Sequence, residues 1–292
     1  GGAGYIGSHV LLSIIENKHE VTVIDDLSTG NKELVPSSIK LINCNINDEE
    51  SISNLLQKES FDLLLHFAGF IKVEESVQNP EKYFNNNTDN AIKLFKNCRK
   101  YGLNNIIFSS TAAVYGNPIN SSSIIENENT KPLNPYGESK VNTENFLLKN
   151  SDKYNSIILR YFNVAGADPK LRSGLISEEP THLIKILSEV AIGKREKIFI
   201  YGKDYNTNDG TAIRDYIHVS DLASIHLELA KFLLLQKKSN IFNCGYGKGY
   251  SVLEVINAAN KITGNKINYE YEKRRPGDAE RLVSSVDKLH KH

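Results

Sequence analysis

The 292-residue sequence contains no methionine and no tryptophan, and it has three cysteines. Cys44, Cys98 and Cys244 lie far apart and form neither a CxxC motif nor a cysteine–histidine ligand pattern. The sequence therefore predicts neither a disulfide framework nor a metal site. Buried, reduced thiols are typical of a reducing compartment, so we expect a cytoplasmic protein.

The charges balance: 35 Lys and Arg residues face 35 Asp and Glu residues, spread along the chain without a basic cluster. This pattern gives no support to nucleic-acid binding. No apolar run approaches the roughly 18 residues that a membrane-spanning helix needs, and no signal peptide is visible. We therefore expect no membrane segment.

Both ends of the chain are unusual. A glycine-rich turn starts at residue 1 with no strand before it, and the last residues, 286–292, enter what reads as a helix. We expect an internal piece of a longer protein, without the first strand of its sheet and truncated at its carboxyl end. In a doubly wound sheet that first strand is central, so the piece alone is expected to fold poorly.

Short apolar runs alternate with longer amphipathic stretches, which predicts an α/β protein with a doubly wound parallel Rossmann sheet. After Asn163 the alternation breaks, which indicates a smaller, irregular α/β substrate domain. We assign residues 1–163 and 214–245 to the first domain and 164–213 and 246–292 to the second. The predicted helices are 6–17, 48–58, 80–101 and 134–149, the strands 21–24, 40–43, 62–66, 105–109 and 156–160, and the loops 121–129, 168–180 and 204–210.

Gly1, Gly4 and Gly7 precede a predicted helix, and a strand ending in Asp25 follows 18 residues after Gly7. This spacing is typical of a dinucleotide site, where glycines admit the pyrophosphate to a helix N-terminus. An acid at Asp25 can bind the adenosine ribose and repels a 2′-phosphate. The pattern predicts NAD rather than NADP.

Tyr136 and Lys140 lie four residues apart on a predicted helix and therefore on one face. A fixed ammonium favours phenolate, so we expect Lys140 to lower the pKa of Tyr136 toward neutrality. The tyrosine would then be a general base.

With further motifs the chain resembles the extended short-chain dehydrogenase/reductase superfamily, and within it the sugar-nucleotide 4-epimerases, over its whole length. The motifs are His66-Phe-Ala-Gly69, Glu75-Ser-Val-Gln-Asn-Pro80, Asn85-Asn-Asn87, Phe108-Ser-Ser-Thr111, Arg160-Tyr-Phe-Asn-Val-Ala-Gly166, Asp209 to Val219 and Arg274-Arg-Pro-Gly-Asp278.

The resemblance implies the roles of individual residues. Tyr136 would take the sugar O4 proton, Lys140 would bind the nicotinamide ribose, and Thr111 would lie between substrate and tyrosine. The cofactor would contact Gly1, Gly4, Tyr5, Ile6, Gly7, Asp25, Asp26, Leu27, Ser28, Asn45, Ile46, Phe67, Ala68, Gly69, Asn86, Tyr136, Lys140 and Phe162. The substrate would contact Thr111, Asn163, His182, Arg214, Arg275, Asp278 and Leu282.

Structural interpretations exist beside several of these roles. Arg160 and Arg214 could be ion-pair arginines, and Leu282 could be a packing residue. His66 and His218 read more as core histidines than as catalytic ones. The sequence also departs from its relatives at Asn45, where many have Asp, and at Ile71 with Lys72, where some have Lys at the first position.

Two alanines, Ala112 and Ala113, stand where the related dehydratases and decarboxylases place an acid. The implied activity is therefore reversible C4 epimerisation of UDP-glucose and UDP-galactose through a 4-keto intermediate with tightly bound NAD. The alternatives are a 4-epimerase of another nucleotide sugar (UDP-N-acetylhexosamine, UDP-pentose or UDP-glucuronate) and a non-catalytic NAD-binding sensor. The resemblance also implies a homodimer through the 80–101 and 134–149 helices.

Overall fold

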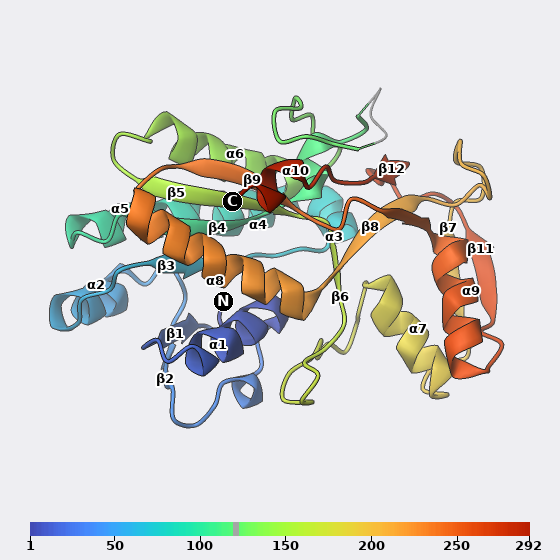
Figure 1. Cartoon of the computed structure of the whole chain (residues 1–292), viewed down its shortest axis with the longest axis horizontal. Coiled ribbons are helices and arrows are strands. Elements are labelled where there is room, and N and C mark those ends of the chain that lie inside the picture. Colours follow the sequence, from blue (N-terminus) through green and yellow to red (C-terminus); the bar gives the residue numbers. More distant parts are fainter. Residues whose placement is uncertain (119–122) are drawn as a thin grey trace.

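The computed structural model describes residues 1–118 and 123–292, so part of the predicted 121–129 loop lies outside the described residues. Four parallel strands form the main sheet: β3 (Leu64–His66), β4 (Asn105–Thr111), β5 (Asn155–Tyr161) and β9 (Asn240–Cys244), in that order (Figure 1). A second parallel pair, β1 (Thr22–Asp25) and β2 (Lys40–Asn43), is a separate sheet. The predicted α/β fold class is confirmed.

The glycine turn lies between these two sheets. The amino group of Gly1 donates to the Ile24 carbonyl at 2.5 Å, at the end of β1. A Cβ on Gly1 would lie 2.3 Å from the backbone nitrogen of Ala68, just after β3. The turn therefore touches the carboxyl end of both sheets, the edge at which parallel sheets bind ligands.

Helices cover both faces of the main sheet. On one face α2 (Glu49–Lys58), α5 (Ala91–Lys100) and α6 (Pro135–Lys149) bury a cluster that contains Ile106, Phe108 and Ile158. On the other face α8 (Val219–Gln236) packs on Ile107 and Leu159, with α1 (Tyr5–Glu16) alongside α8. Neighbouring strand residues thus point to opposite faces, and both faces are apolar, as in a buried parallel sheet.

The predicted helix 80–101 is not one regular α-helix. It consists of α4 (Pro80–Tyr83), the π-helical segment η2 (Phe84–Asn90) and α5. The wider turn coincides with a run of three asparagines, which are poor helix formers. It brings Asn87 and Thr88 against α6, where both bond to Ser139, and π-helical turns are frequent at functional sites.

The rest of the chain forms a smaller lobe on the right of Figure 1. β8 (Ile213–His218) pairs with β6 (Asn163–Ala165), β10 (Gly249–Ser251) and β12 (Arg281–Leu282), while β7 (Ile198–Tyr201) pairs with β11 (Tyr269–Glu272). α7 (Leu183–Ala191) and α9 (Val252–Thr263) enclose a core of their own around Leu187, Ile200 and Ile256. The division into two domains stays a prediction, and this separate core is consistent with it.

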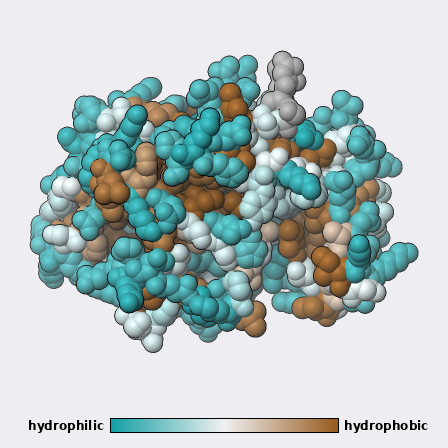
Figure 2. Space-filling view, viewed as in Figure 1, coloured by the Kyte–Doolittle hydropathy of each residue, from teal (hydrophilic) through white to brown (hydrophobic). Residues whose placement is uncertain are grey.

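Short elements complete the described chain: η1 (Lys32–Leu34), α3 (Val73–Gln78), η3 (Ala112–Tyr115) and α10 (Asp287–His290). The face in Figure 2 is largely hydrophilic, with hydrophobic side chains along α8 and near α7. Within residues 1–118 and 123–292, no helix has the length and apolar character needed to cross a membrane.

Candidate active site

The Tyr136/Lys140 pair lies in the first two turns of α6. Asn134 caps this helix, with its side-chain oxygen accepting from the Gly137 backbone at 2.9 Å, and Pro135 occupies the first helical position. An Asn cap followed by Pro is a strong helix start, because it satisfies a free N–H and presets φ. The local sequence therefore fixes where both side chains leave the helix.

Lys140 is almost fully buried, with 3% of its surface exposed. Its ammonium donates to the Ser109 carbonyl at 2.9 Å and lies 5.0 Å from the centre of the Phe108 ring. Burial lowers the pKa of Lys140 to about 8, against a smaller opposite effect of Glu144. A Cβ on Gly69 would come within 3.1 Å of the ammonium, so glycine leaves that side open.

Tyr136 is linked to Thr111 by a side-chain hydrogen bond, and the catalytic roles of these two residues and of Lys140 stay predictions. The expectation that Lys140 lowers the pKa of this tyrosine is wrong for the protein by itself. Burial raises the pKa of Tyr136, and the Thr111 hydrogen bond offsets part of that rise. The cause is desolvation of the phenolate, while the nearby ammonium is itself desolvated and bonded to Ser109.

Thr111 ends β4 and caps the short helix η3, where its hydroxyl accepts from the Ala113 backbone at 3.1 Å. This cap fixes the hydroxyl next to the phenol. Ala112 and Ala113 follow directly, and Ala112 is buried in an apolar cluster. The two side chains that directly follow Thr111, at the start of η3, therefore offer no acid or base.

Asn87 is a site residue to which the sequence analysis gave no role. Its side chain accepts from the Phe70 backbone at 2.9 Å and donates to the Phe70 carbonyl at 3.0 Å and to Ser139 at 3.1 Å. It thus ties the loop after β3 to α6 between Tyr136 and Lys140. The signal was present in the three consecutive asparagines, of which Asn86 alone had been assigned a role.

The N-terminus of α1 has the features that a pyrophosphate site needs. Its cap is Gly4, without a side-chain hydrogen bond, and its first turn carries no acid. A Cβ at Gly7 would lie 2.4 Å from the Gly1 carbonyl, so this turn requires glycine. Free N–H groups and the positive end of the helix dipole favour an anion. The residues present fit the diphosphate of a dinucleotide.

Asp25, the last residue of β1, and Asp26, which follows it, are already engaged by the protein. Asp25 accepts from the backbones of Ala3 and Leu27, both at 2.9 Å. Asp26 accepts from Ser28 and from the Asn45 amide, the latter at 2.6 Å. A carboxylate accepts about four hydrogen bonds, so both acids have capacity left for ribose hydroxyls. Their contact with the cofactor stays a prediction.

Apart from Asn86 and Phe162, the remaining predicted cofactor residues occupy three segments at this edge. Two segments follow β2 and β3, and one opens α1. Tyr5 donates to the Gly166 carbonyl at 2.6 Å, and Asn86 donates to Asn87 at 3.2 Å. Phe162 instead packs with Tyr115 and Leu282. The segment after β2 contains Asn45 and Ile46, the segment after β3 contains Phe67, Ala68 and Gly69, and the start of α1 contains Tyr5 and Ile6.

Three predicted substrate residues come together from distant parts of the chain. Asp278 accepts from Arg214 at 2.5 Å and from Arg275 at 3.4 Å. Arg214 also donates to the Ala279 carbonyl at 2.6 Å, whereas Arg275 is 39% exposed and stacks 4.4 Å from the centre of the Tyr201 ring. Two adjacent guanidinium groups at a partly open position can bind a diphosphate.

The other substrate residues lie around this group. Leu282 pairs with Arg214 in the β12–β8 ladder, is 8% exposed and packs with Ala112, Tyr115 and Phe162. Asn163 is exposed at the start of β6. The ring of His182, just before α7, lies 6.2 Å from that of Tyr5, and burial lowers its pKa.

Three of the residues with a structural interpretation beside a functional one are His66, His218 and Arg160. His66 is 2% exposed between Phe95 and Phe108, and burial holds its pKa well below the ordinary value. His218 caps α8 by accepting from the Ser220 backbone at 3.2 Å. Arg160 forms a buried ion pair with Glu144 at 2.6 Å. Arg160 and His218 fit the structural interpretation. His66 lies in the core, but neither of its ring nitrogens has a hydrogen-bond partner among the described residues.

Comparisons with known proteins give one family. Residues 1–245 match the NAD dependent epimerase/dehydratase family. A UDP-glucose 4-epimerase of Azospirillum brasilense is 44% identical over 291 residues, which cover 99% of this chain and 83% of the relative. The chain belongs to the NAD-dependent epimerase/dehydratase family.

Solved structures agree with this assignment. The UDP-glucose 4-epimerase from Stenotrophomonas maltophila, with bound NAD and formylated UDP-arabinopyranose, superposes with a TM-score of 0.95 at 33% identity, covering 100% of this chain and 90% of that one. The UDP-Glc/GlcNAc 4-epimerase from Campylobacter jejuni superposes with a TM-score of 0.83 at 43% identity, with the same coverage.

Proposed function

We propose that this protein interconverts UDP-glucose and UDP-galactose by epimerisation at C4, through a 4-keto intermediate. The observation that carries the proposal is the hydrogen bond between Tyr136 and Thr111, with the buried Lys140 one helical turn further along α6. The near-full-length likeness to UDP-glucose 4-epimerases supports it.

NAD, when bound, supplies the hydride acceptor and donor at C4. The chain's own residues would hold it: the α1 N-terminus would take the pyrophosphate, and the acids at the end of β1 would take the adenosine ribose. Lys140 uses one of three N–H donors on Ser109, which leaves two for the nicotinamide ribose. Gly69 allows the close approach of that ribose.

Tyr136 must lose a proton to act as a base, yet burial raises its pKa in the protein alone. With NAD in place, the Lys140 ammonium and the positive charge that oxidised NAD would bring to the site would together favour the phenolate. Thr111 passes the O4 proton to Tyr136 and back, because its hydroxyl both donates and accepts. The proton never has to leave the site.

The course after oxidation follows from what surrounds Thr111. Elimination or decarboxylation needs an acid or base near C5 and C6, and the chain has Ala112 and Ala113 there. The 4-keto sugar is therefore reduced again. Arg214 and Arg275 hold the diphosphate while the sugar turns, so that reduction from the opposite side inverts C4.

The test is to incubate full-length protein with UDP-galactose and separate the products. UDP-glucose should appear, and Tyr136→Phe should lower its rate of formation by roughly 10²–10⁴-fold, the usual cost of losing a general base. Tyr101→Phe is the matched control, since Tyr101 accepts a hydrogen bond from Gln57 at the surface. A Tyr136→Phe variant as fast as this control would refute the assignment of the base.

We further infer a range that includes N-acetylated sugars. Some relatives have Tyr where this chain has Leu282, and leucine leaves more room beside the sugar 2-substituent. The Campylobacter jejuni relative is described as a UDP-Glc/GlcNAc 4-epimerase. Leu282→Tyr should reduce turnover of UDP-N-acetylglucosamine more than that of UDP-glucose. Wild-type protein that is active on UDP-glucose but inactive on UDP-N-acetylglucosamine would contradict this inference.

The homodimer through the 80–101 and 134–149 helices stays part of the proposal. Exposed hydrophobic side chains near these helices support it: Val77 is 46%, Leu133 43% and Leu148 39% exposed. Sedimentation of Leu148→Glu beside the wild type tests it. A wild type that sediments as a monomer would exclude this interface.

A further inference from the structure

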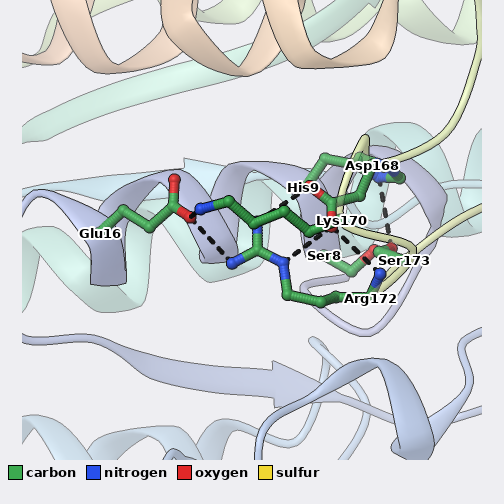
Figure 3. A network of polar contacts seen from close by, with 7 residues as sticks. All are labelled: Ser8, His9, Glu16, Asp168, Lys170, Arg172 and Ser173. Carbon is green, nitrogen blue, oxygen red and sulfur yellow. Dashed lines mark hydrogen bonds and ion pairs between the residues drawn. The ribbon is translucent and has the colours of Figure 1, made fainter.

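Residues 166–173, which follow β6, are fastened to the cofactor helix α1 by a polar network (Figure 3). The outer part of the network is ionic. Arg172 donates to Asp168 at 2.7 Å and 2.9 Å and to Glu16, near the end of α1, at 2.8 Å. Lys170 donates to the same Glu16 oxygen at 2.7 Å. The two contacts with Glu16 join residues more than 150 positions apart.

The inner part of the network is buried and has a defined direction. Ser8 donates to the Tyr5 carbonyl at 3.0 Å, so it accepts from Ser173 across their 2.6 Å contact. His9 Nδ1 lies 2.7 Å from the same carbonyl and must therefore carry the proton there. The Ser173 hydroxyl lies 3.4 Å from this nitrogen. Burial lowers the pKa of His9, which keeps the ring neutral and preserves this arrangement.

The fastened segment lies between two predicted substrate residues. Asn163 precedes it in β6, and His182 follows it at the start of α7. Tyr5, the first residue of α1, donates to the Gly166 carbonyl at 2.6 Å, and its ring faces that of His182. Gly166 itself has φ +92°, and a Cβ there would meet the His218 ring at 2.3 Å. The segment therefore has little freedom at its start.

We propose that Ser173 is a positioning residue: through Ser8 and His9 it fixes segment 166–173, and with it Asn163 and His182, against the helix that receives the cofactor pyrophosphate. The uridine diphosphate end of the substrate is thereby held at a set distance from the cofactor. This inference rests on the proposed function, since it assumes a UDP-bearing substrate.

The test measures UDP binding to the NAD-loaded protein by calorimetry, without turnover. Ser173→Ala should raise the Kd for UDP by about 3- to 10-fold, the effect of one or two lost hydrogen bonds. Amide hydrogen exchange should increase in residues 166–176. Ser8→Ala with Ser173→Ala should be no worse than either change alone, because both residues act through one contact.

Ser53→Ala is the matched control. Ser53 also joins two distant segments, donating to Asn97 at 3.2 Å, but it lies away from the site. Ser53→Ala should lower the free energy of unfolding by about as much as Ser173→Ala does, but it should leave the Kd for UDP unchanged. An unchanged UDP Kd in Ser173→Ala, or an equal rise in Ser53→Ala, would overturn the proposal. A wild type that binds UDP without epimerising sugars would refute the proposed function and leave this test valid.

Discussion

Two arginine–carboxylate clusters use the same chemistry in different surroundings. In the first cluster, Arg160 of β5 and Glu144 of α6 are 4% and 2% exposed. The arginine also donates to Tyr115 at 2.9 Å and to the Glu126 carbonyl at 3.1 Å. At the substrate end, Arg275 and Asp278 are 39% and 22% exposed and lie 3.4 Å apart. The first cluster is closed to ligands, whereas the second can exchange its partner for a diphosphate.

The difference shows that an arginine's function depends on which of its donors remain free. Arg214 lies between the two cases: it bonds to Asp278 and also to the Ala279 and Ile213 carbonyls. It therefore holds segment 278–280 against β8 while it lies beside Arg275. Asp278, which would repel a diphosphate alone, orients both guanidinium groups.

The largest effect that we expect is a loss of stability when the buried arginine loses its carboxylate partner. Glu144→Gln leaves the Arg160 charge buried without its partner, and loss of one member of such a pair costs about 3–5 kcal/mol. Urea unfolding should show this decrease in the free energy of unfolding. The double variant Glu144→Gln with Arg160→Met should lose less, since no unpaired charge remains. A single variant within about 1 kcal/mol of wild type would mean that the pair is not closed.

Arg275→Met, in the exposed cluster, should weaken UDP binding and leave the stability nearly unchanged. We expect a UDP Kd raised about 10-fold or more, because a charge-assisted hydrogen bond contributes about 1.5–3 kcal/mol. The free energy of unfolding should change by no more than about 0.5 kcal/mol, as at most exposed positions. Calorimetry and urea unfolding on one preparation measure both. An intact UDP affinity would move the diphosphate site away from Arg275.

A smaller effect should appear in the pH dependence of cofactor binding, through the buried ammonium of Lys140. Its pKa is lowered to about 8, so the ammonium is present below that pH and lost above it. NADH affinity of the cofactor-free protein should therefore fall by up to about tenfold from pH 7 to pH 9. The fluorescence of bound NADH measures this affinity. Lys140→Met should show a weaker but flat profile; a flat wild-type profile would contradict the shift.

Local sequence was sufficient for the catalytic helix. The cap at Asn134, the proline after it and the spacing of Tyr136 and Lys140 are all contained within a few residues. The glycine turn and the end of β4 at Thr111 are equally local. These features define the carboxyl edge of the sheet, although β4 runs two residues beyond the predicted strand 105–109.

Features that depend on distant contacts could not be predicted. The direction of the Tyr136 pKa shift depends on how much of the fold covers the phenol. β8 pairs with β6, β10 and β12, and these pairings join residues far apart in the chain. The contact of Ser173 with Ser8 spans 165 positions. No local pattern encodes such pairs.

The central claim is that hydrogen at C4 is carried by the cofactor and returned, while Tyr136 and Thr111 handle the O4 proton. The direct measurement is to convert UDP-galactose in D₂O and examine the recovered UDP-glucose by NMR. The account predicts UDP-glucose with ordinary hydrogen at C4, because that hydrogen never exchanges with solvent. Deuterium at C4, or no UDP-glucose at all, would contradict it.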